Sequence, residues 1–432
     1  MGTKEQVAAR IEDREASMVE FLSDLVAART VTGNEGPGQE LLVERFEALG
    51  LEPDVWEPDP GRLRDHEGYF ETSSFARVGY EGRPNVAARL AGSGDGPTLA
   101  LSGHVDVVDV TEDEWDHDPW ALTREGDRLF GRGAADMKGG LAAILLAVES
   151  LRDLDVDLAG DLLLLSTIEE EDGGVGGTLS ALERGYVPDA ALVAEPYGVP
   201  NVGTASAGVM YFRVTVPGKS AHAAWGHEGV NAIGKATEVY RALDDLDRER
   251  KARIDYEPAY RATPGLEGNV TNINLGTIRA GDWPSTVPAE AVVEGRVGWP
   301  PGESREEVRE QVEGAVDAVA TDDGWLADNP PRVEWFGWQA APHEVPEDCE
   351  IATRAKRNAE AATGREGQFI GGSAGLDERF YERYYDVHAV SVGPEGERLH
   401  GADETTTVTS LLETATTLAW TALDYCGEAT DD

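Results

Sequence analysis

A histidine and a carboxylate stand two residues apart, directly after an apolar run whose length is typical of a β-strand. The run is Thr98–Ser102, and the two residues are His104 and Asp106. Because side chains alternate along an extended chain, both are expected on one face at the carboxyl end of the predicted strand. A histidine backed by a carboxylate suits a metal ligand whose tautomer the carboxylate fixes. Taken alone, such a motif is more often an ordinary satisfied polar pair.

Three further acidic groups follow predicted strands or precede a predicted helix. They are Asp136 in the glycine-rich stretch 131–140, Glu169–Glu171 after a run ending at Ile168, and Glu195 after a run ending at Ala194. Open α/β sheets build their sites at the carboxyl ends of strands, so we expect these side chains to meet there. An apolar strand has little reason to end in carboxylates unless a cation binds them. The alternative is a set of solvated strand ends in a chain that is acidic throughout.

Strand-length apolar runs alternate with helical patterns in the first half of the chain. A helical segment is predicted from about Thr3 to Leu49, and a helix packed on the sheet over Gly139–Leu151. The predicted strands are Asn85–Leu90, Thr98–Ser102, Asp161–Ile168 and Ala190–Ala194. This alternation predicts the α/β class, with a mixed, mostly parallel sheet covered by helices.

The pattern changes between about residues 206 and 340. The predicted elements there are the strand Val209–Val216, the helix Asn231–Asp247, the strands Thr271–Ile278 and Ala289–Val297, the helix Ser304–Val319 and the strand Arg332–Phe336. The order β-α-β-β-α-β is the split β-α-β arrangement, with both helices on one face of the sheet. We therefore predict a catalytic domain over 1–205 and 341–432, with a second domain, 206–340, inserted in it.

Acidic residues dominate the composition. Asp and Glu number 82 against 37 Lys and Arg, which gives a formal net charge of −45 over 432 residues. Acid dispersed along a chain is typical of proteins from a highly saline cytoplasm. Without a basic face the chain is not expected to bind nucleic acid or acidic membranes. It shows no membrane-length apolar run and no signal-peptide core, so we expect a cytoplasmic location. Cys349 and Cys426 are too few for a disulfide framework.

Together the motifs resemble the zinc metallopeptidase and deacylase family that includes aminoacylase, acetylornithine deacetylase, succinyl-diaminopimelate desuccinylase and glutamate carboxypeptidases. The resemblance spans nearly the whole chain. Its motifs, in family order, are Gly103–Asp106, Gly131–Gly140, Glu169–Gly174, Glu195–Pro196, Gly218–His222 and His400–Glu404.

The resemblance implies two zinc ions, with cobalt as the alternative metal. It implies one ion held by His104, Asp136 and Glu195, and a second held by Asp136, Glu171 and His400, so that Asp136 bridges the pair. Mixed histidine and carboxylate ligands are typical of catalytic zinc.

Glu170 is implied as the general base, with Asp106 as a further catalytic residue. Adjacent residues on an extended segment face opposite ways, which favours one base and one ligand for Glu170 and Glu171. The family usually has Asp at the position of Glu169, so with three consecutive glutamates the register can shift by one residue.

Five residues outside the metal motifs match family positions that contact substrate. The resemblance implies that His222 stabilises the oxyanion, often from the partner subunit, which requires a homodimer in which residues 206–340 act as a lid and dimerisation domain. Asn272 and Arg296 match lid positions, and the forked guanidinium of Arg296 suits a carboxylate. Gly372 and Ser373 match a late loop of the substrate pocket, although the sequence that follows them departs from common family versions.

The remaining histidines match no ligand motif, and most of them are predicted to lie on the surface or in loops. One of them, His117, lies in a loop that resembles a packing loop of the family rather than its metal shell. The five are His66, His117, His227, His343 and His388.

Glu195 bears on the reaction, because deacylase relatives tend to have Glu at this position and several peptidase relatives have Asp. We therefore predict hydrolysis of an N-acyl amino acid, of the acetylornithine deacetylase and succinyl-diaminopimelate desuccinylase type. The alternatives are a dipeptidase or carboxypeptidase, an N-formyl amine deformylase, and a noncatalytic binding homologue that kept only the fold.

Overall fold

The computed structural model describes residues 2–263 and 265–428. The chain divides into two compact units. The first comprises Met1–Ala205, Glu344–Ile370 and Leu376–Asp432, and the second comprises Ser206–His343 and Gly371–Gly375. The short segment Gly371–Gly375 thus groups with the second unit, whereas the predicted division places everything after residue 340 in the first.

A nine-stranded sheet forms the centre of the first unit. Its order is β1-β2-β6-β3-β7-β17-β8-β15, with β16 beside β8. The four central strands β6, β3, β7 and β17 run parallel, while β2 and β8 flank them antiparallel. β3 and β6 are buried over their whole length, as expected of parallel strands covered on both faces. The strands are β1 Asp54–Trp56, β2 Asn85–Leu90, β3 Leu99–His104, β6 Leu162–Thr167, β7 Ala190–Val193, β8 Val202–Ser206, β15 His343–Glu344, β16 Phe369–Gly371 and β17 His388–Ser391.

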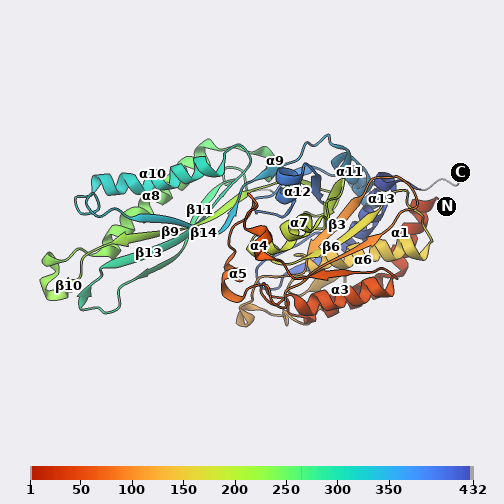
Figure 1. Cartoon of the computed structure of the whole chain (residues 1–432), viewed down its shortest axis with the longest axis horizontal. Helices are drawn as coiled ribbons and strands as arrows, with labels where there is room; N and C mark the ends of the chain where they lie inside the picture. The colour runs from red at the N-terminus through yellow and green to blue at the C-terminus, as the bar shows by residue number, and fades with distance from the viewer. Residues whose placement is uncertain (1, 264, 429–432) are drawn as a thin grey trace. The chain divides into compact units, whose positions relative to one another are not determined.

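Helices α6, α11 and α13 lie beside the large sheet (Figure 1). α2 contacts α6, α6 contacts α13 and α13 contacts α11, and α6 and α13 also pack on β3. α6 is buried from Lys138 to Leu151, because it is apolar on nearly all sides. The N-terminal helix α1 lies against the C-terminal helix α13. No helix among the described residues combines the length and the apolar character needed to cross a membrane. The helices of this unit are α1 Thr3–Asp13, α2 Glu15–Ala27, α3 Gly36–Ala48, α4 Pro60–Leu63, α5 Ser73–Val78, α6 Lys138–Asp153, α7 Ser180–Arg184, α11 Glu350–Thr363, α12 Glu378–Tyr385 and α13 Val408–Cys426.

The predicted continuous helical segment from Thr3 to Leu49 is wrong between α2 and α3. Residues 28–35 form a turn there instead of helix. Arg29 and Gly33 have φ values of 51° and 106°, in the left-handed region that interrupts an α-helix. The turn brings Thr32 to the candidate site described below.

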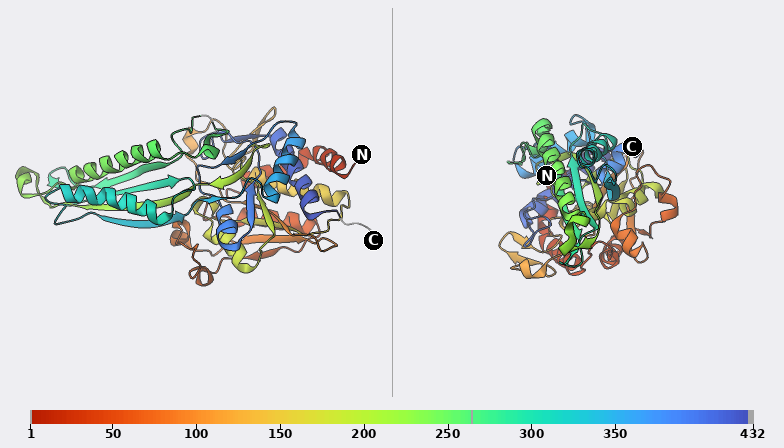
Figure 2. Two further views of the ribbon diagram at one scale, coloured as in Figure 1. Left: turned by 90° about the horizontal axis from the view of Figure 1, so that it is seen from above. Right: turned by 90° about the vertical axis from the view of Figure 1, so that its left-hand side faces the viewer.

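The second unit is built on a four-stranded antiparallel sheet in the order β11-β13-β9-β14. Helices α8 and α10 lie side by side on one face of it (Figure 2). The predicted fold class is confirmed, with parallel pairing of β6, β3, β7 and β17 at the centre of the large sheet. The elements are β9 Gly208–Pro217, β10 Ala221–His222, α8 Ala232–Arg253, α9 Glu257–Tyr260, β11 Asn272–Ala280, β12 Thr286–Val287, β13 Glu290–Trp299, α10 Arg305–Asp322 and β14 Arg332–Ala340.

Two small sheets complete the described fold. One pairs β10 with β12, and the other has the order β18-β5-β4. Its strands are β4 Thr123–Glu125, β5 Arg128–Phe130 and β18 Thr405–Thr407.

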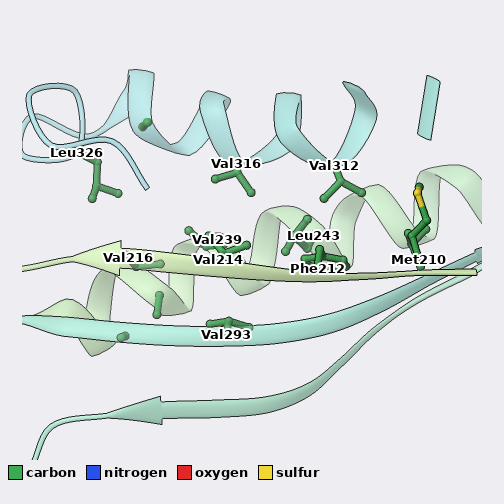
Figure 3. Close-up of a cluster of buried hydrophobic side chains, with 14 of the residues drawn as sticks. Met210, Phe212, Val214, Val216, Val239, Leu243, Val293, Val312, Val316 and Leu326 are labelled. Atoms are coloured by element: carbon green, nitrogen blue, oxygen red, sulfur yellow. The ribbon is translucent and has the colours of Figure 1, made fainter. Parts of the chain in front are cut away.

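The core of the second unit lies between its sheet and its two helices (Figure 3). Burial along β9 alternates, so that every second side chain from Met210 to Val216 points toward the helices. The helices contribute residues spaced three or four apart, which share one face of each helix. They are Ala232, Ala236, Val239 and Leu243 of α8, and Val308, Val312, Val316 and Ala320 of α10.

Phe212→Ala is expected to lower the free energy of unfolding by about 3–5 kcal/mol, because it removes a fully buried ring and leaves a cavity. Ile278→Ala on β11 is the matched control, since Ile278 is exposed and its loss should cost less than about 0.5 kcal/mol. Denaturant titration in molar salt measures both. Equal destabilisation by the two variants would contradict the assignment of the core.

Candidate metal centre

The candidate site lies where three neighbouring parallel strands end. β6, β3 and β7 are adjacent in the sheet, and the residues predicted to do chemistry follow their carboxyl ends. His104 is the last residue of β3, Glu170 and Glu171 form a 3-10 turn after β6, and Glu195 follows β7 by two residues. Parallel strands bring these side chains to one edge of the sheet.

His104 is buried and oriented by its own strand end. Its Nδ1 lies 2.9 Å from the backbone carbonyl oxygen of Asp106, which can only accept a hydrogen bond. In the neutral imidazole Nδ1 therefore carries the hydrogen, and Nε2 presents its lone pair. The Asp106 carboxylate lies farther away, at 3.5 Å. The group that orients His104 is therefore the backbone carbonyl of Asp106 and not the carboxylate that the sequence predicts.

Nε2 of His104 faces three carboxylates. It lies 3.3 Å from Asp136 Oδ1, 3.6 Å from Glu195 Oε1 and 3.8 Å from Glu170 Oε2. No hydrogen bond to a described residue satisfies this nitrogen, although it is buried. A buried nitrogen lone pair among carboxylate oxygens is the arrangement expected of a metal ligand.

Asp136 lies between the two histidines. Its Oδ1 faces His104, and its Oδ2 lies 3.3 Å from Nε2 of His400. The same His400 nitrogen lies 3.0 Å from Glu171 Oε2. Asp136 can thus offer one oxygen to each of two cations.

The donor set fits a divalent metal. The ligand atoms of His104, Asp136 and Glu171 lie within 4.8 Å of one another, and so do those of His104, Glu170 and Glu195. Glu170, the predicted base, therefore lies close enough to belong to one of the groups. Glu170 Oε1, Glu171 Oε1 and Glu195 Oε1 are buried without a hydrogen bond to any described residue. Such oxygens are costly to bury unless a cation binds them.

The pKa values of these groups reflect the excess of buried carboxylates over cationic groups at the site. Burial raises the pKa of Glu171, and it raises the pKa of Glu170 and Glu195 well above the ordinary value. Burial would also raise the pKa of Asp136, but the facing imidazoles outweigh it and hold that pKa low. Asp136 and Glu171 raise the pKa of His400 to about 10. Positive charge is therefore favoured here, whether protons or metal ions supply it.

Glu169 points away from this cluster. Its φ of 64° lies in the left-handed region, which turns its side chain into a separate buried network. Its carboxylate accepts hydrogen bonds from Thr72 Oγ1 (2.7 Å), Ser74 Oγ (2.7 Å), Tyr80 OH (3.1 Å) and Gly176 N (2.7 Å). This placement favours Glu170 and Glu171, rather than Glu169, as the functional pair.

The Asp106 carboxylate fixes the turn that carries this pair. It accepts hydrogen bonds from the backbone N–H groups of Glu170 (3.1 Å) and Glu171 (3.3 Å). Thr32 Oγ1 donates a third, at 2.9 Å. Sequence reasoning missed Thr32, because no local pattern marks a residue whose partner is 74 positions away.

Glu404 is a second missed residue. It is fully buried and accepts hydrogen bonds from the backbone N–H groups of Gly133 (3.1 Å), Ala135 (3.0 Å) and Asp136 (3.0 Å), so it holds the loop that carries Asp136. Arg132 Nη1 donates to it at 2.5 Å. Its place four residues after His400 in a single motif was the available signal.

The predicted substrate residues belong to the second unit. Arg296 Nη1 donates to Asn272 Oδ1 at 2.7 Å, so this pair is brought together. His222 is exposed, and its Nδ1 accepts a hydrogen bond from Ala224 N at 3.1 Å. Gly372 and Ser373 lie in the segment Gly371–Gly375. The roles of these five residues stay predictions.

The fold and the site are those of a metal-dependent hydrolase with a centre of carboxylates and histidines. The sequence profile of Peptidase family M20/M25/M40 matches residues 100–424, and the chain belongs to this family. The predicted resemblance and enzyme class, a metal-dependent amidohydrolase, are confirmed at this level.

Curated relatives differ in their substrates. N-formyl-4-amino-5-aminomethyl-2-methylpyrimidine deformylase of Bacillus subtilis is 34% identical over 271 residues, 60% of this chain and 61% of that protein. The protein of the same name from Halalkalibacterium halodurans is 30% identical over 349 residues, 77% and 74% of the two chains. Succinyl-diaminopimelate desuccinylase of Leptothrix cholodnii is 31% identical over 306 residues, 69% and 72%. The match to the Bacillus subtilis protein leaves more than a third of that relative uncovered.

Solved structures share the fold at low identity. The yeast dipeptidase Dug1p superposes with a TM-score of 0.76 at 15% identity, over 98% of both chains. A tripeptidase of Staphylococcus aureus gives a TM-score of 0.71 at 21% identity, over 95% of this chain and 98% of that one.

Asp106→Asn is expected to weaken metal binding about tenfold to a hundredfold. One carboxylate oxygen becomes an NH₂ group, which cannot accept the hydrogen bond from the backbone N–H of Glu170 or Glu171. Thr32→Val removes only one hydrogen bond to the same carboxylate and should have a smaller effect. Zinc titration of the chelator-treated proteins, with circular dichroism as the folding control, measures both. Unchanged affinity in Asp106→Asn would argue against its role.

Proposed function

We propose that this chain hydrolyses the amide bond of an N-acyl amino acid, at a pair of zinc ions held by His104, Asp136, Glu171, Glu195 and His400. The observation that carries the proposal is the buried cluster of His104 Nε2 with one oxygen each of Glu170, Glu171 and Glu195, none of which has a hydrogen bond to a described residue. Zinc bound there would polarise the substrate carbonyl and lower the pKa of a water molecule. Cobalt is the alternative metal. Among solved structures of the same fold, one is a dinuclear metal-binding peptidase of the M20 family from Bacillus subtilis.

Glu170 is proposed as the general base and acid. Its Oε1 is buried without a hydrogen bond to a described residue, and the backbone of its turn is fixed by Asp106. Burial raises its pKa well above the ordinary value, which suits a carboxylate that takes a proton from water and then delivers it to the leaving nitrogen. Asp106 assists by holding that turn.

Arg296 is proposed to bind the carboxylate of the substrate. It is half-buried, and within residues 2–263 and 265–428 it forms no ion pair, although acidic residues greatly outnumber basic ones. Burial lowers its pKa, as expected of a guanidinium that no carboxylate compensates. Asn272 orients it, and a substrate with a free carboxylate would supply the missing anion.

The remaining proposals concern the homodimer, the substrate pocket and the cellular environment. His222 is proposed to stabilise the oxyanion from the partner subunit of a homodimer, for which its exposed position leaves it available. Gly372 and Ser373 are proposed to line the substrate pocket. The dispersed acidic surface supports a saline cytoplasm as the working environment.

A second candidate function is hydrolysis of an N-formyl amine. Two curated relatives are N-formyl-4-amino-5-aminomethyl-2-methylpyrimidine deformylases, one of them matched over 349 residues. Such a substrate needs the same metal pair and base. It would make no use of Arg296 as a carboxylate partner, and this difference separates the two candidates.

The test is hydrolysis of a substrate panel in molar salt with added zinc or cobalt, with chelator controls. The panel contains N-acetylornithine, N-succinyl-diaminopimelate, N-acetyl amino acids, N-formyl amines and dipeptides. We expect chelator-sensitive cleavage of an acylated amino acid. For that substrate Arg296→Ala should raise KM about tenfold to a hundredfold, since a charged hydrogen bond is lost.

Arg279→Ala is the matched control, because Arg279 is exposed on β11 and already pairs with Glu294. It should leave KM unchanged. Cleavage of N-formyl amines alone, with no effect of Arg296→Ala, would favour the second candidate. Absence of any cleavage would favour a noncatalytic homologue.

Glu170→Gln is expected to lower kcat by at least about a hundredfold, because the amide can neither accept nor deliver the proton. Bound metal should stay near the wild-type amount. Steady-state kinetics and metal analysis of the same preparation measure the two quantities. Activity near the wild-type rate would remove Glu170 from the mechanism.

A further inference from the structure

His400 differs from the other proposed ligands in its exposure. Its side chain is 53% exposed, whereas those of His104, Asp136, Glu171 and Glu195 are at most 13% exposed. His104 ends the buried strand β3, Glu195 follows the buried strand β7, and hydrogen bonds to the carboxylates of Asp106 and Glu404 fix the backbone of Glu171 and Asp136. His400 therefore depends on whatever fixes the loop that carries it.

That loop, 398–403, has an unusual backbone. Arg398, His400 and Asp403 have φ values of 58°, 61° and 56°, in the left-handed region that non-glycine residues seldom adopt. Such residues persist only where contacts with the surroundings fix them. The side chain of Asp403 makes some of those contacts at the end of the loop, and Arg132 Nη2 makes another by donating to the carbonyl oxygen of Gly401 at 3.2 Å.

Asp403 is anchored to the loop that contains His117. Its Oδ1 accepts hydrogen bonds from Asp116 N (3.2 Å), His117 N (3.1 Å) and His117 Nδ1 (2.9 Å). Since a carboxylate only accepts here, Nδ1 of His117 is the donor. Arg398 Nη1 lies 3.5 Å from the other carboxylate oxygen.

His117 is itself fixed. Its ring stacks on Phe130 of β5, with 4.2 Å between centroids and 11° between planes, and its Nε2 lies 3.6 Å from Glu125 Oε1. Phe130 in turn pairs with Thr405, just beyond the loop of His400. The imidazole is therefore a rigid link between the small sheet and Asp403.

We propose that His117 is a positioning residue for one of the two metal ions, because its hydrogen bond to Asp403 holds the loop that presents His400. The inference rests on the proposed function, in which His400 is a ligand of one ion only. Residue His117 touches neither metal nor substrate, so it acts through Asp403.

The neighbouring hydrogen bonds of Glu404 provide a comparison. Glu404 holds the backbone of Asp136, which is proposed to bind both ions, so its loss should affect both. The link through His117 holds Asp403 at the end of the His400 loop, whereas the backbone of Asp136 is held by Glu404. Loss of this link should therefore weaken one ion selectively, which a general loss of folding would not do.

The test is a zinc titration of the chelator-treated chain in molar salt, which resolves two dissociation constants. His117→Phe keeps a ring on Phe130 and removes the donor, and we expect it to weaken one zinc ion about tenfold while the other binds as in the wild type. His117→Asn replaces Nδ1 with an amide donor and should restore most of the affinity. At low zinc kcat should fall in His117→Phe with KM unchanged, and excess zinc should restore it.

His388→Phe is the matched control, because His388 Nδ1 also lies 2.9 Å from a carboxylate, that of Glu382, away from the site. It should bind both ions as the wild type does. Wild-type binding of both ions by His117→Phe would overturn the inference, and so would equal weakening of both ions with a lowered melting temperature. A wild-type chain that binds fewer than two zinc ions would instead overturn the proposed function.

Discussion

The structure depends on the burial of several carboxylates at one edge of a sheet in a chain of net charge −45. Asp136, Glu170, Glu171 and Glu195 meet there, and His104 and His400 face them, while the buried guanidinium of Arg379 interacts electrostatically with Glu170. Burial alone penalises each carboxylate, and each neighbour adds repulsion. Two divalent cations would compensate this charge. The strand order and the glycine-rich loops matter because they bring these groups together despite their mutual repulsion.

Hydrogen bonding separates two kinds of buried carboxylate at and around the candidate site. Asp106, Glu169 and Glu404 accept from backbone N–H groups, so they hold loops in place. Glu170, Glu171 and Glu195 each keep a buried oxygen without a hydrogen bond to a described residue. The first kind is satisfied by the protein itself, whereas the second needs a ligand. The same residue type thus takes opposite roles, according to the donors that the fold supplies.

Much of the fold and of the placement of the candidate site could be predicted from local patterns. Apolar runs marked β3, β6 and β7, and the polar residues directly after them became the site, because parallel strands end at one edge. The turn that breaks the N-terminal helices and carries Thr32 was missed, since it depends on two left-handed residues. The Glu169–Glu171 register was left open, because three identical residues differ only in backbone conformation. The link between His117 and Asp403 joins residues 286 positions apart and leaves no periodic signal.

The acidic background makes the number of carboxylates a poor guide to the site. Most acidic side chains of this chain are solvated, and burial combined with missing donors narrows the candidates to a few, which still include Asp377 and Glu378 beside the proposed ligands. The acidic composition also bears on the source of the affinity for metal. At molar salt the screening length falls to about 3 Å, so the long-range field of the surface cannot concentrate zinc. Affinity must then come from ligands in direct contact and from the loops that position them. This is why an exposed ligand such as His400 needs a fixed loop more than the buried ligands do.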